Sequence, residues 1–168
     1  MGREVRKVPP HWEHPIQEGW SDGRLQPMYD ESYQRARGEW LCGLAGWTRT
    51  DEDYWESEGN PPNRAYYRPW QDDEATWFQV WETVSEGTPV TPPFPTREQL
   101  AEYLYTHGDK WDQKRGAGPW SRESAIEFVF NDGYVPSLVV VNGRVIEGRD
   151  VPAELPRCRG KEASDAEA

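Results

Sequence analysis

The pattern of apolar and polar residues is clearest in the second half of the chain. Residues 76–84, Thr-Trp-Phe-Gln-Val-Trp-Glu-Thr-Val, are rich in β-formers and aromatics and predict a strand. Alternation places Phe78, Val80 and Glu82 on one face and Trp77 and Trp81 on the other. Because both faces are largely apolar, we expect this strand to lie between two layers of the protein.

Two helices and a hairpin are predicted after this strand. Thr96-Arg97-Glu98-Gln99 is a capping box, and the helix that follows carries Leu100, Tyr103, Leu104 and His107 on one face and ends at Gly108. Residues 109–120 are predicted as a polar loop. A second helix begins at Ser121, turns Ala125, Ile126, Val129 and Phe130 inward, and ends at Gly133. Residues 136–141 predict a buried strand, and Asn142-Gly143 predicts a tight turn into a return strand at 144–147.

These elements predict an α+β fold, with a small sheet of strand, two helices and β-hairpin, on which an aromatic-rich, irregular N-terminal half is wrapped. We expect a single domain over residues 1–156, divided into a Trp- and Tyr-rich wrapping region (1–75) and an α+β core (76–151). Residues 157–168 are small and charged, and they predict a disordered acidic tail.

Composition changes this picture in one respect. Leu, Ile, Val and Phe are scarce for a folded chain of 168 residues, but 10 Trp and 8 Tyr supply apolar surface.

The net charge of −11 opposes direct binding to the phosphate backbone of nucleic acids. No stretch is apolar enough to span a bilayer. Two cysteines far apart, Cys42 and Cys158, with no apolar leader at the N-terminus, favour a reducing cytosol and two free thiols.

The segment after the first predicted strand is the best candidate for a site. It combines two carboxylates, hydroxyls and a glycine where loops on rigid scaffolds carry functional groups. Glu82 falls on an apolar face, so it is either a carboxylate of raised pKa suited to acid–base chemistry or a hydrogen-bonded structural group. We prefer the structural interpretation. The candidate binding residues are Trp77, Trp81, Glu82, Thr83, Ser85, Glu86, Gly87 and Thr88.

Other chemical groupings are weaker. His11-Trp12-Glu13-His14 holds two imidazoles, but the flanking prolines forbid the helix that would align them, so we expect no metal and no cofactor. His107 is interpreted as a histidine that complements the helix dipole. A Ser85–His107–Asp109 triad can be written, but only geometry could support it.

Two further segments could contact a partner. Residues 51–58 hold five acids, which we interpret as a solvated face or, alternatively, as an anionic surface that engages a basic partner. Residues 64–70, Arg-Ala-Tyr-Tyr-Arg-Pro-Trp, could stack bases, although the acidic balance favours a role in the core.

Several motifs resemble those of a widespread family of small bacteriophage and prophage proteins. The similar stretches are Gly2-Arg3-Glu4-Val5-Arg6-Lys7-Val8-Pro9, Trp12-Glu13-His14-Pro15, Trp81-Glu82-Thr83, Ser85-Glu86-Gly87-Thr88-Pro89, Leu100-Ala101 and Gly133-Tyr134-Val135-Pro136-Ser137. The family has no established activity, so the resemblance implies a setting, a phage gene expressed in the host bacterial cytoplasm, rather than a mechanism.

Together these observations favour a non-enzymatic phage accessory protein. We expect it to bind a host macromolecule, a protein in preference to nucleic acid, and to inhibit a host defence or modulate a host enzyme. The alternatives are a small nucleotide-binding protein or hydrolase that uses the loop after the first core strand, and a virion-associated protein. The sequence leaves the oligomeric state open.

Overall fold

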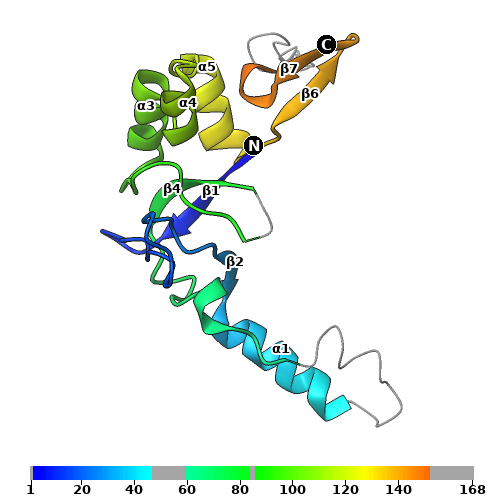
Figure 1. The fold of residues 1–168 in the computed structure, drawn as a ribbon. Helices are drawn as coiled ribbons and strands as arrows, with labels where there is room; N and C mark the ends of the chain where they lie inside the picture. The colour runs from blue at the N-terminus through cyan, green and yellow to red at the C-terminus, as the bar shows by residue number, and fades with distance from the viewer. Residues whose placement is uncertain (1, 47–59, 84–85, 152–168) are drawn as a thin grey trace, which may run out of the picture.

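A three-stranded antiparallel sheet forms the centre of the protein. The computed structural model describes residues 2–46, 60–83 and 86–151. Strand β1 (Arg3–Val8) lies between β4 (Trp77–Glu82) and β5 (Tyr134–Val135), with Arg3 opposite Glu82 and Val8 opposite Trp77 (Figure 1). The α+β class is therefore confirmed, but the N-terminal segment supplies the central strand of the sheet instead of only wrapping it.

Strand β4 separates two apolar clusters, as its alternating pattern predicted. Val80 belongs to a cluster that we call the helix-side core, whose other buried members include Leu100, Leu104, Ala125 and Val129. On the opposite face, Trp81 belongs to the tryptophan core, which also contains Val8, Met28, Trp70 and Ala75. Met28 and Trp70 come from the first half of the chain, so that half does insert apolar side chains against the sheet.

The helix-side core is covered by three short helices, one more than the sequence predicted. Helix α3 (Arg97–His107) begins at its N-cap Thr96 and ends at Gly108, as expected. Helix α4 (Lys110–Arg115) occupies the segment predicted as a loop. It is too short for a periodic pattern, and a capping box between Asp109 and Asp112 stabilises its first turn.

Helix α5 (Arg122–Glu127) continues into a π-helix, Phe128–Asp132, and the segment buries a face that differs by one residue from the predicted one. The cap at Ser121 and the end at Gly133 match the prediction. Ala125 and Val129 are buried as expected, but Ile126 and Phe130 are exposed and Phe128 is buried instead. The buried residues Ser124, Ala125, Phe128 and Val129 keep helical spacing, so the period holds and the buried face is rotated by one residue from the predicted one. The amide of Gly133 donates to the carbonyl of Phe128 and closes the π-turn.

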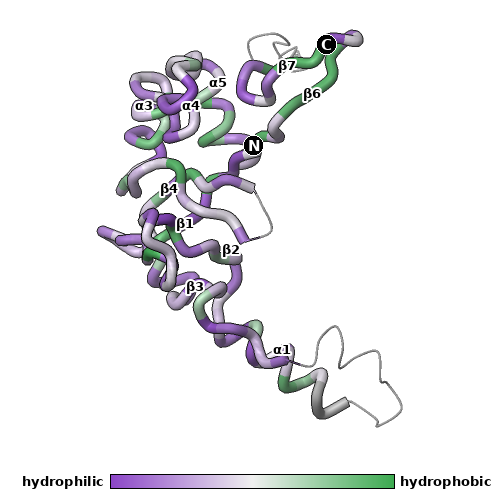
Figure 2. The backbone as a smooth tube through the Cα atoms, viewed as in Figure 1, coloured by the Kyte–Doolittle hydropathy of each residue, from purple (hydrophilic) through white to green (hydrophobic). Residues whose placement is uncertain are grey.

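The predicted hairpin forms, but it is a separate two-stranded sheet. Strands β6 (Leu138–Val141) and β7 (Arg144–Glu147) are joined by Asn142 and Gly143, whose φ angles of 49° and 78° are those of the predicted tight turn. The prediction that β6 is buried is wrong, because its side chains are exposed or only half-buried. Figure 2 shows this hydrophobic strand at one end of the molecule, beyond the sheet.

The first half of the chain also contains regular structure. Strand β2 (Tyr29–Ser32) pairs in parallel with β3 (Tyr67–Arg68) and leads into helix α1 (Tyr33–Gly46), which extends away from the sheet (Figure 1). The 3₁₀ turns η1 (Arg64–Tyr66) and η3 (Gly148–Asp150) complete the fold. No helix in the described ranges is both long and apolar enough to cross a membrane. The acidic run 51–58 and the tail 157–168 lie outside the described residues.

Candidate functional site

The segment after β4 returns along the same strand, which brings Glu82 and Thr88 together. The amide of Glu82 donates to the carbonyl of Thr88 at 3.0 Å, and the Thr88 hydroxyl donates to Glu82 Oε1 at 2.5 Å. The second carboxylate oxygen, Oε2, accepts a hydrogen bond from the indole nitrogen of Trp111 on α4 at 2.9 Å. Glu82 is buried, and both of its oxygens are used to join β4, its returning loop and α4. This arrangement favours the structural interpretation of Glu82.

Glu86 and Gly87 are held against the buried guanidinium of Arg6. Arg6 donates to the carbonyls of Met28 at 2.7 Å and Glu86 at 3.3 Å, and it lies 4.6 Å from the centre of the Trp81 ring. Gly87 has a φ of +78°, and a Cβ there would stand 2.7 Å from the carbonyl oxygen of Glu82. The loop is therefore packed so closely onto Arg6 and β4 that only glycine fits at this position.

The remaining candidates in this region are also engaged. The amide of Thr83 donates to the carbonyl of Gly2 at 2.9 Å. Trp81 is buried and its indole nitrogen donates to Gln79, whereas the half-buried Trp77 packs against the His11 ring with centroids 4.5 Å apart. Ser85 lies outside the described residues. The structure thus brings most of the predicted residues together as packing and hydrogen-bonding partners.

A buried ion cluster, which the sequence analysis missed, adjoins this region. Asp112 Oδ1 lies 3.1 Å from Arg3, 3.1 Å from Arg149 and 3.0 Å from Arg115, and its Oδ2 accepts a hydrogen bond from the Trp120 indole at 2.7 Å. Burial opposes ionisation of Asp112, but the Trp120 hydrogen bond and the charges of Arg3 and Arg149 together hold its pKa below 3.8. The only sequence signal was the spacing of Asp109 and Asp112, which is that of a capping box.

Asp109 belongs to the same cluster and not to a catalytic triad. Its Oδ2 accepts from Arg3 Nε at 2.5 Å, and its Oδ1 accepts from the amides of Trp111 and Asp112. His107 is exposed, stacks on Tyr103 with centroids 4.9 Å apart, and shares a hydrogen bond with the Thr106 hydroxyl. The partners of Asp109 and His107 therefore give no support to the Ser85–His107–Asp109 arrangement.

His14 is half-buried, and both of its ring nitrogens have hydrogen-bond partners. Its Nε2 lies 2.6 Å from the carbonyl of Gln26, and its Nδ1 accepts a hydrogen bond from the Trp12 indole at 3.3 Å. Burial lowers the pKa of His14 below 6.5, and the charge of Arg6 adds to this against the opposing hydrogen bond to Gln26. In the ranges that the structure describes, no group of three His, Cys, Asp or Glu residues could hold a metal ion.

Three large apolar side chains on the β6–β7 hairpin are exposed to solvent. Val140 pairs with Val145 and Leu138 with Glu147, so Leu138, Val140 and Val145 share one face of the hairpin. These three side chains are 60%, 69% and 64% exposed. Three of the six other large apolar residues that are exposed in the described part of the chain lie shortly before the hairpin in the sequence, at Ile126, Phe130 and Tyr134, and the remaining three are Ile16, Trp20 and Leu41. An exposed apolar face such as that of Leu138, Val140 and Val145 is typical of contact sites for other molecules.

Comparison with known proteins finds no matching family model, curated protein or solved structure.

Proposed function

We propose that the protein is a non-enzymatic accessory protein that binds another protein through the exposed face of the β6–β7 hairpin. The observation that carries this proposal is the exposure of Leu138, Val140 and Val145 on one face of a two-stranded sheet. The motifs that resemble phage and prophage proteins suggest the setting, in which the partner is a host protein of the bacterial cytoplasm. Binding would then inhibit a host defence or alter the activity of a host enzyme.

A partner that buries the exposed hairpin face would gain hydrophobic free energy that folding of the chain alone does not provide. An isolated two-stranded hairpin is marginally stable in water. Full burial of an aliphatic side chain contributes about 1.5–3 kcal/mol, of which a side chain more than half exposed has gained less than half. A partner that covers this face would recover the remainder at three neighbouring positions. The apolar contact area would also stabilise the hairpin itself.

The alternatives have weaker support. Both oxygens of Glu82 hold structural contacts, so no free carboxylate is available there for acid–base chemistry. The net charge of −11 disfavours a polyanionic nucleic acid as the partner. A protein with an apolar contact surface fits both the exposed face and the charge.

Site-specific photocrosslinking tests this proposal. A photoreactive amino acid replaces Val140 in the full chain, which is expressed in bacteria and irradiated. We expect one dominant crosslinked protein, and we expect the double substitution Val140→Thr with Val145→Thr to weaken its binding. Threonine keeps the β-branched shape while adding a hydroxyl that water satisfies.

The control uses an equally exposed aliphatic residue elsewhere. Ile16, 60% exposed in the loop before β2, carries the same photoreactive group or the substitution Ile16→Thr. Crosslinking at position 140 that is no more specific than at position 16 would contradict the proposal. A crosslinked partner from the virion would instead identify the protein as virion-associated.

A further inference from the structure

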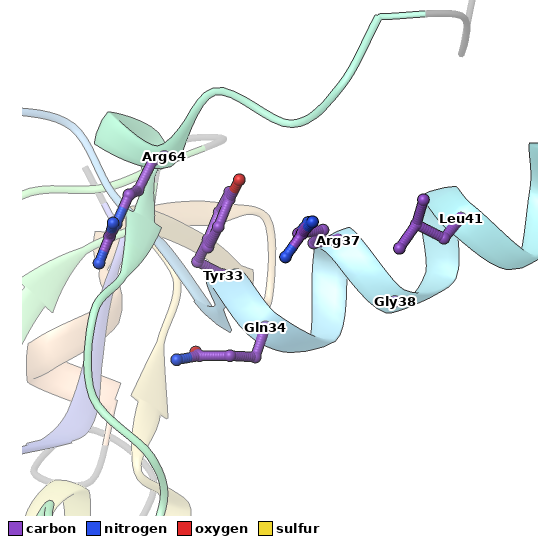
Figure 3. A pocket seen from close by; sticks show the side chains of 6 residues that line it. All are labelled: Tyr33, Gln34, Arg37, Gly38, Leu41 and Arg64. Carbon is purple, nitrogen blue, oxygen red and sulfur yellow. The ribbon is translucent and has the colours of Figure 1, made fainter.

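A second surface, at the opposite end of the molecule from the hairpin, has the chemistry of a ligand site. A hollow of about 340 Å³ lies between α1 and η1. Figure 3 shows its lining side chains, which are Tyr33, Gln34, Arg37, Gly38, Leu41 and Arg64. Tyr33, Arg37 and Leu41 are spaced four residues apart and therefore share one face of α1.

The two arginines of the hollow lie on either side of an aromatic ring. The guanidinium carbon of Arg64 is 5.6 Å from the centre of the Tyr33 ring. In Figure 3 the Tyr33 ring stands between the Arg64 and Arg37 side chains, and Leu41 continues the row along the helix. The hollow thus presents an aromatic ring and an aliphatic side chain with a positive charge on each side of the ring.

Among the described residues, these arginines differ from their neighbours because no carboxylate pairs with them. On the same helix, Arg35 pairs with Glu31 and Glu39, and on β3 Arg68 contacts Asp30 and Asp72. Within the described residues, neither Arg37 nor Arg64 pairs with a carboxylate. Two such guanidinium groups that flank one ring, in a chain of net charge −11, can bind an external anion.

Gly38 lines the hollow without contributing a side chain. Glycine inside a helix is less favourable than alanine by about 0.5–1 kcal/mol. A Cβ at Gly38 would meet no atom within 4 Å, so no close packing of the protein requires glycine there. The missing side chain leaves space beside Arg37 and Leu41.

We propose that this hollow binds a small phosphate-bearing aromatic compound of the nucleotide class. The base stacks on Tyr33 and against Leu41, and Arg37 and Arg64 bind the phosphate. A single nucleotide carries few charges, so it avoids the repulsion that an acidic chain exerts on a long polyanion. The site is separate from the β6–β7 hairpin and does not depend on the function proposed for it.

Titration calorimetry of the full chain with AMP, adenosine and inorganic phosphate tests the assignment. We expect AMP to bind more tightly than either fragment. Arg37→Gln and Arg64→Gln should each weaken AMP binding about tenfold, because each removes charged hydrogen bonds to the phosphate. Arg35→Gln is the matched control, since Arg35 lies on the same helix but pairs with glutamates, and it should leave the affinity unchanged.

Gly38→Leu separates binding from folding. Leucine fills the hollow and favours the helix, so we expect AMP binding to be lost while the melting temperature stays the same or rises. The proposal is overturned if AMP does not bind at about 10 mM, or if Arg35→Gln weakens binding as much as Arg37→Gln. Phosphate that binds as tightly as AMP would overturn the role of Tyr33, and unchanged binding to Gly38→Leu would overturn the location.

Discussion

The loop that follows β4 and the β6–β7 hairpin differ in how far the fold satisfies their side chains. The loop carries the residue types that catalysis uses, yet Glu82 is bonded on both oxygens and Glu86 and Gly87 are packed onto Arg6. The hairpin carries residue types that normally form a core, yet Leu138, Val140 and Val145 face outward. In this protein the exposed apolar side chains of the hairpin, and not the carboxylates of the loop, indicate where further contacts are made.

The largest loss of stability is expected in the buried ion cluster beside the loop that follows β4. Asp112→Ala removes the carboxylate that Arg3, Arg115 and Arg149 share, so that the buried Arg3 retains Asp109 and the buried Arg149 retains the half-buried Glu147 as carboxylate partners. We expect the free energy of unfolding to fall by about 3–5 kcal/mol, measured by urea denaturation. Asp150→Ala, an exposed acid beside Arg149, should change it by less than about 0.5 kcal/mol. Equal effects of the two substitutions would contradict the account of the cluster.

Glu82→Gln, in the loop that follows β4, is expected to have a smaller effect on stability. The amide oxygen of glutamine can still accept from Trp111, and its NH₂ group can donate to the Thr88 hydroxyl after that hydroxyl turns. We therefore expect a loss of about 1 kcal/mol in the free energy of unfolding, because only the charge of the hydrogen bonds is lost. A stability gain would be the contrary result, since it would indicate a carboxylate held at a cost to folding for a functional reason.

The stability of the protein should depend on pH through His14. Its pKa is lowered in the folded state, so between that pKa and about 6.5 the unfolded chain binds more protons than the folded one. The free energy of unfolding should therefore fall as the pH decreases from about 6.5 and level off below the folded pKa. Urea titrations between pH 5 and 7.5 measure this slope. His14→Gln should remove most of it, and a slope that persists in that variant would assign it to another group.

The smallest effect on stability is expected at the hairpin. Val140→Thr with Val145→Thr changes side chains that are mostly exposed, so the free energy of unfolding should change by less than about 0.5 kcal/mol. A larger loss would indicate that these valines pack within the chain. The same double substitution is nevertheless expected to weaken partner binding, so that the two valines contribute to binding and not to stability.

Local signals in the sequence predicted the elements that local interactions determine. Thr96 and Gly108 bound α3, Asn142-Gly143 makes the hairpin turn, and the alternation in β4 matches two cores on opposite faces. These features depend on neighbouring residues or on strict periodicity, which a single sequence displays.

Features that depend on distant residues were not predictable in the same way. Strand β1 was missed because the positions that it buries include Arg3 and Arg6, whose partners Asp109 and Met28 are far away in the sequence. Strand β6 was assigned to the interior because four consecutive aliphatic residues read as a core strand, whereas no helix layer of the core covers it. The hollow at α1 depends on Arg64, which approaches Tyr33 only in the folded chain.

The central claim is that the partner protein binds the exposed face of the β6–β7 hairpin, formed by Leu138, Val140 and Val145, and not the loop that follows β4. Its most direct test is the dissociation constant of the crosslinked partner for three purified proteins: the unchanged chain, Glu82→Gln, and the Val140→Thr, Val145→Thr double variant. The account predicts that Glu82→Gln binds within about twofold of the unchanged chain and that the double variant binds at least about tenfold more weakly. Normal binding by the double variant together with lost binding by a folded Glu82→Gln protein would contradict it.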